Sequence, residues 1–74
     1  MERRSLAAHI AHSVKSVMEA NNVSPEILAE ATGIPELTLR ERLDLESPFT
    51  FGEVMDVGGF FSLPASSFFE GANA

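Results

Sequence analysis

Apolar residues recur every three or four positions along most of this chain, which is the spacing of helices that bury one face. In the first segment the recurring residues are Leu6, Ala7, Ile10, Ala11, Val14, Val17 and Met18. The polar residues Ser5, His9, His12, Ser16 and Glu19 lie elsewhere around the segment. The pattern predicts an amphipathic helix that ends at residues 20–22, where asparagine tolerates the left-handed conformation of a helix end.

A second, shorter helix is predicted to start at Ser24-Pro25-Glu26. The serine can cap the helix, proline suits its first position, and an acid suits the positive end of the helix dipole. We expect Ile27, Leu28 and Ala31 to face inward and the helix to stop at Gly33.

Pro35 begins a third predicted helix, in which Leu39 and Leu43 lie one turn apart on the same face. Ile34 is expected to be buried in the turn before it. Pro48 ends the segment, because the residue before a proline is driven out of the helical region.

The last third predicts two more helices. Thr50 and Glu53 have the spacing of a capping box. The inner face of the helix that follows is expected to carry Val54, Val57, Gly58 and Phe61. Pro64 then starts a short helix that returns Phe68 to the core, and residues 71–74 are expected to fray. The fold class is therefore all-α, with five short helices in a single domain spanning residues 1–74.

Charge is distributed unevenly. The formal net charge is −6, and residues 23–74 contain only Arg40 and Arg42 against nine acids. A strongly basic face, which is typical of nucleic-acid binders, is absent. The chain has no cysteine, no apolar run long enough for a membrane span and no secretory signal, so we expect a cytoplasmic protein.

The segment "LAEATGIPELTLRERL" and the downstream "SPFTFGEV" and "VGGFFSLPASSFF" resemble the lambda-repressor-like (Xre/Cro) helix-turn-helix family. The resemblance covers about residues 5–70 and implies a helix-turn-helix at about 25–44. The small Ala29 lets the next helix cross closely, and Gly33 allows the tight turn.

Four residues depart from the family pattern, and one of them is Asp44, where asparagine or serine is common. Leu45 and Ser62 occupy positions where the family usually has a turn glycine, and Gly58 occupies one where alanine is usual. Glycine costs about 1 kcal/mol of helix propensity, so the fourth helix is expected either to be weak or to allow close packing.

The resemblance implies that the helix beginning at Pro35 enters the major groove of DNA. The residues expected to meet DNA are Ser24, Glu36, Leu37, Thr38, Arg40, Glu41 and Arg42. Arginine can contact guanine, glutamate can accept a hydrogen bond from cytosine, and leucine can touch a thymine methyl group. Ser24 and Thr38 suit phosphates at helix N-termini.

A purely structural role is the alternative explanation for these charged residues. Glu36 suits its helix N-terminus, and Glu36–Arg40 is an i,i+4 pair worth about 0.2–0.5 kcal/mol. The cations available for phosphates are Arg3, Arg4, Lys15, Arg40 and Arg42, and not all of them can face one duplex. Useful affinity for DNA would therefore require a homodimer or a partner protein.

Six phenylalanines crowd the last third of the chain. Phe51, Met55, Phe60 and Phe69 are candidates for a dimer or partner surface, although a small core could also enclose them. His9 and His12 lie three residues apart, but without a third ligand they are expected to be solvated rather than to bind a metal. We find no catalytic constellation and no cofactor motif.

The leading hypothesis is a single-domain, phage Cro-like transcriptional regulator that binds a double-stranded DNA operator, and it is not an enzyme. The competing hypothesis is an acidic protein-interaction module that binds a basic partner such as a repressor. A DNA binder that works only beside a basic protein is a third possibility.

Overall fold

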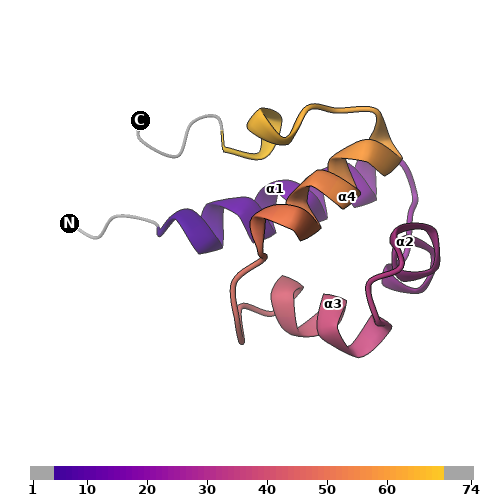
Figure 1. Ribbon diagram of the computed structural model, residues 1–74, viewed down its shortest axis with the longest axis horizontal. Coiled ribbons are helices and arrows are strands. Elements are labelled where there is room, and N and C mark those ends of the chain that lie inside the picture. Colours follow the sequence, from indigo (N-terminus) through magenta and orange to yellow (C-terminus); the bar gives the residue numbers. More distant parts are fainter. Residues whose placement is uncertain (1–4, 70–74) are drawn as a thin grey trace.

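The computed structural model describes residues 5–69, in which four α-helices are followed by one short 3₁₀ helix (Figure 1). The elements are α1 (Leu6–Ala20), α2 (Pro25–Thr32), α3 (Glu36–Leu43), α4 (Phe51–Phe61) and the 3₁₀ helix η1 (Ala65–Phe68). The all-α class is confirmed.

The prediction of a fifth α-helix is wrong, because residues 65–68 form a short 3₁₀ helix instead. Its backbone bonds, Ser67 N–H to Pro64 O and Phe69 N–H to Ser66 O, span three residues rather than four. The predicted frayed tail, residues 71–74, lies outside the described residues.

The predicted helix boundaries follow from side-chain caps. The Ser24 hydroxyl accepts a hydrogen bond from the Ile27 amide at 3.2 Å, with Pro25 at the first helical position. Thr50 and Glu53 form the complete capping box, with bonds of 3.1 and 3.0 Å. Gly33 closes α2 in the left-handed conformation at φ 82°. Local sequence therefore determines where these helices start and stop.

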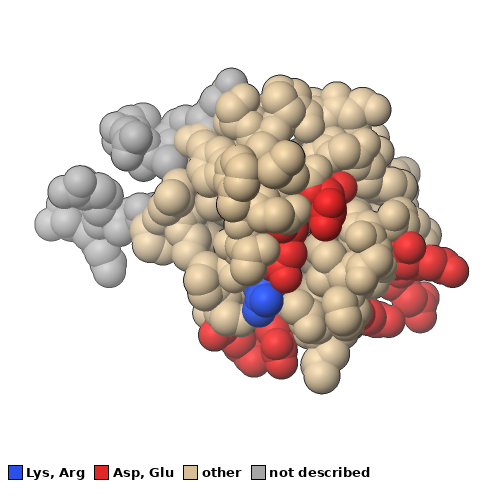
Figure 2. Space-filling model, viewed as in Figure 1, with Lys and Arg blue, Asp and Glu red and all other residues tan. Residues whose placement is uncertain are grey.

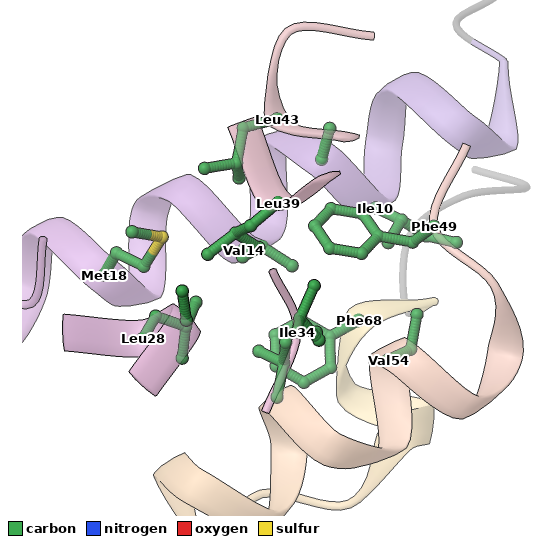
Figure 3. Packing of buried hydrophobic residues seen from close by; sticks show 13 residues of the cluster. Ile10, Val14, Met18, Leu28, Ile34, Leu39, Leu43, Phe49, Val54 and Phe68 are labelled. Carbon is green, nitrogen blue, oxygen red and sulfur yellow. The ribbon is translucent and has the colours of Figure 1, made fainter. Parts of the chain in front are cut away.

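Every described element contributes to one apolar core (Figure 3). Its members are Ile10, Ala11, Val14, Met18, Leu28, Ala29, Ile34, Leu39, Leu43, Phe49, Val54, Val57 and Phe68. Leu39 and Leu43 share the inner face of α3 as expected, and Phe68 of η1 is only 1% exposed. No polar or charged residue is buried among residues 5–69.

Two inward positions predicted for α2 are wrong. Ile27 is 51% exposed and Ala31 is also exposed, whereas Leu28 and Ala29 are buried. The buried stripe is centred between Leu28 and Ala29, which places Ile27 about 150° away around the helix axis. The small Ala29 side chain therefore faces the core, and the larger Ile27 is left in solvent.

Gly58 lies where the end of α4 meets the chain that leads into η1. A Cβ at this position would lie 2.6 Å from the Leu63 carbonyl oxygen, whereas at Gly59 nothing lies within 4 Å. The Leu63 amide also donates to the Gly58 carbonyl at 2.8 Å. The glycine that departs from the family pattern therefore permits a close backbone approach.

Replacing Leu45 with glycine is expected to stabilise the protein by about 0.5–1 kcal/mol. Leu45 is half exposed and has φ 65°, a left-handed conformation that costs a non-glycine residue about 1–2 kcal/mol. Part of the gain is lost because glycine is more flexible in the unfolded chain. Urea unfolding followed by circular dichroism measures the change. A lower unfolding midpoint for Leu45→Gly would contradict it.

Candidate nucleic-acid interface

The outer line of α3 carries the exposed Leu37 and the partly exposed Glu41, and Asp44 follows as the C-cap of the helix. Taking Leu39 and Leu43 as the inner face, helical geometry places Glu41 about 180° from the core and Leu37 about 140° from it. Leu37 is 71% exposed. The most outward part of this helix is therefore apolar and acidic, and it contains no cation.

Arg40 lies to one side of this line and is bonded within its own helix. Its Nε and Nη2 donate to Glu36 Oε2 at 2.9 and 2.7 Å. Both side chains remain substantially exposed, at 52% for Arg40 and 40% for Glu36. The structural role that the sequence left open for this pair is thus present, and because the pair is exposed it can open at little cost.

Arg42 lies on the other side of α3 and faces another part of the chain. Its Nε and Nη2 donate to the two carboxylate oxygens of Glu53 at 2.8 and 3.2 Å, and its Nη1 donates to Ser47 Oγ at 2.6 Å. The Arg42 and Glu53 side chains are only 18% and 17% exposed. The structure therefore does not place Arg42 with the exposed candidates: it joins the end of α3 to the start of α4.

The same network shifts the pKa of both groups. Hydrogen bonds from Arg42 lower the pKa of Glu53, with a further contribution from the Thr50 amide, and the Glu53 carboxylate raises the pKa of Arg42. Because the folded pKa of Glu53 is below its ordinary value, its ionised form is the one that stabilises the fold.

The stabilisation by Glu53 is expected to be present at neutral pH and to be lost as pH falls below about 4.5, the ordinary value of this carboxyl group. Thermal unfolding from neutral pH to about pH 3 is the measurement, with Glu53→Gln as the comparison. The gap in melting temperature between the two proteins should narrow as pH falls. A gap that stays constant would show that ionised Glu53 does not stabilise the fold.

A hollow of about 280 Å³ brings residues from α1 and α3 together beside the start of α2. It is lined by Lys15, Met18, Glu19, Val23, Pro25, Arg40, Leu43 and Asp44. The sequence offered Lys15 as one of five cations for phosphates but gave no sign of which other cation lies near it. Its position beside Arg40 is a property of the tertiary structure.

A second hollow, of about 580 Å³, lies between α2 and α3 and has an acidic lining. Glu26, Glu30 and Glu36 line it together with Ala29, Gly33 and Ile34. None of these lining residues is basic. Three of its six lining residues are therefore acidic.

The candidate aromatic surface is divided in two by α4. Phe51 stacks on Phe69 with ring centroids 6.3 Å apart, and Met55 lies one turn after Phe51, 53% exposed. Phe60 lies about 180° from Phe51 around the helix and packs edge-on against Phe61, with centroids 4.9 Å apart. Phe51, Met55 and Phe69 therefore form one patch, and Phe60 lies apart from it.

Charge on the described surface is predominantly negative. Residues 5–69 contain three basic and nine acidic side chains, and the face in Figure 2 shows several acidic areas with one basic area. The predicted N-terminal cations Arg3 and Arg4 lie outside the described residues. Within residues 5–69, no group of three or more histidine or acidic side chains has a geometry that could hold a metal ion. No helix in this range has the length and apolar character that a membrane span requires.

Comparison with protein-family models, curated proteins and solved structures finds no match for this chain.

Proposed function

We propose that this protein is a lambda-repressor-like helix-turn-helix regulator that inserts α3 into the major groove of an operator. The observation that carries the proposal is the α2–Gly33–α3 unit. Leu28 and Leu39 are fully buried and Ile34 is nearly so, which fixes the two helices on the core, while Leu37 on the outer side of α3 is exposed. A short helix fixed from behind and free on its outer face suits groove recognition.

Phosphate contacts would come from the flanks of α3. Lys15 and Arg40 share the rim of one hollow with Pro25, the first residue of α2. Pro35 is the N-cap residue of α3 and makes no side-chain cap hydrogen bond, so the first amides of the helix can donate to a phosphate near Thr38. These groups would position α3 without reading sequence.

Three cations among the described residues predict weak binding by one copy, so we propose that the protein acts as a homodimer. The patch formed by the exposed Phe51 and Met55 and the partly buried Phe69 is the surface that we assign to the second copy. A dimer on a two-fold operator doubles the phosphate contacts and would exclude polymerase or a competing repressor.

Titration of a fluorescent random-sequence duplex at low salt tests the DNA-binding proposal. Binding should weaken steeply with salt, and Arg40→Ala should lower the slope of log affinity against log salt by about 1 if Arg40 neutralises one phosphate. Arg40→Lys keeps the charge and serves as the matched control. No binding at low salt would overturn the proposal.

Sedimentation of the protein with and without duplex tests the dimer. Met55→Ser should shift the protein toward the monomer, whereas Phe60→Ser, on the other side of α4, should not. Equal effects of the two substitutions would contradict the assignment of the surface.

The acidic hollow favours a second function, in which the protein binds a basic partner and masks its DNA-binding surface. Glu26, Glu30 and Glu36 would accept arginine or lysine side chains there. Under this alternative the protein binds a basic DNA-binding protein and not duplex DNA. Glu30→Gln would then weaken the complex, whereas under the DNA-binding proposal it would not weaken binding to duplex.

A further inference from the structure

Leu37 is the most exposed large apolar side chain among residues 5–69. Leu37 is 71% exposed, and Phe51, the next most exposed of these residues, is 63% exposed. Leu37 lies one turn before Glu41 on the outer line of α3. Because the core side of this helix is occupied by Leu39 and Leu43, the fold does not require an apolar residue at position 37.

The residues best suited to reading guanine are not on this line. Arg42 is held by Glu53 and Ser47, and Arg40 lies about 60° around the helix from Leu37, bonded to Glu36. If α3 lay along the major groove, the base edges would therefore first contact the branched alkyl group of Leu37 and the carboxylate of Glu41. Neither can contact the acceptor edge of guanine favourably.

We infer that α3 recognises thymine by its 5-methyl group, through Leu37, and an adjacent cytosine by its N4 amino group, through Glu41. This inference rests on the proposed DNA-binding function and specifies the sequences bound. The thymine methyl is the apolar group in the major groove, and a carboxylate can accept the hydrogen bond that cytosine N4 donates there.

The spacing of the two side chains limits the arrangement of the bases. One turn separates their Cα atoms by about 6 Å along α3, and base pairs rise by about 3.4 Å. The two bases therefore lie within about two steps of one another. The Glu41 carboxylate also repels the acceptor atoms of guanine and thymine, so it disfavours those bases as well as binding cytosine.

The test begins with selection of duplexes from a random pool. Each thymidine in the selected duplex is then replaced with deoxyuridine, which removes only the methyl group of the base. The parent protein should bind the uracil duplex about three- to five-fold more weakly, which corresponds to burial of about one methyl group. Leu37→Ala should bind the thymine duplex more weakly by a similar factor and should not distinguish the two duplexes.

Leu6→Ala is the matched control, because Leu6 is also an exposed leucine but lies on α1. It should retain the preference for thymine. Leu37→Ala is expected to fold normally, and circular dichroism checks this.

Four results would overturn the inference, and they differ in what they say of DNA binding. Equal binding of thymine and uracil duplexes by the parent protein, or a preference retained by Leu37→Ala, overturns the thymine contact and leaves the proposed function standing. A selected motif without thymine does the same. Failure to bind any duplex at low salt overturns both.

Discussion

Replacing Phe68 with alanine is expected to destabilise the fold by about 3–5 kcal/mol, which is comparable to the whole stability of a domain of this size. Phe68 is the largest of the fully buried side chains, and it belongs to η1, which packs against both α1 and α4. A four-residue 3₁₀ turn cannot collapse to fill the space left by a missing ring, so a cavity would remain.

Urea unfolding followed by far-ultraviolet circular dichroism measures this loss. Phe60→Ala is the matched control, because Phe60 is 40% exposed and should cost much less. Similar losses from the two substitutions would show that η1 does not complete the core.

Replacing Gly58 with alanine is expected to destabilise the protein by about 1–2 kcal/mol, while Gly59→Ala stabilises it by about 0.5–1 kcal/mol. An added methyl group at Gly58 would lie 2.6 Å from the Leu63 carbonyl oxygen, a backbone atom that cannot rotate away. At Gly59 the space is open, so only the helix-propensity gain of alanine remains.

The two glycines are neighbours on one helix, so each variant controls for the other. Thermal unfolding of both under the same conditions gives the sign of each change. Stabilisation by Gly58→Ala would show that the approach of residue 63 to α4 is loose enough to adjust.

Local chemistry predicted the helices well. Ser24, Gly33 and the Thr50–Glu53 pair act within three or four residues of themselves, so their effects can be read from the sequence. The inward face of α2 was less predictable, because eight residues provide only two turns. A shift of one position in the buried stripe then decides whether Ile27 is in the core or in solvent.

The candidate interface was harder to predict because its contacts join distant parts of the chain. Arg42 and Arg40 look alike in the sequence, yet Arg42 bonds to Glu53, eleven residues away, and Arg40 bonds within its own helix. Lys15 and Arg40 are brought to one hollow only by the packing of α1 with α3. No periodicity in the sequence indicates either relation.

The position of Phe68 has a consequence for how the protein is made. A ribosome completes α1 long before it reaches Phe68, which follows Ile10 by 58 residues. At the usual rates of synthesis the apolar face of α1 waits on the order of 3 to 12 s for the ring that closes the core beside it. Until Phe68 is added, the apolar face of α1 cannot complete its packing, so sequence order as well as packing governs how this core is assembled.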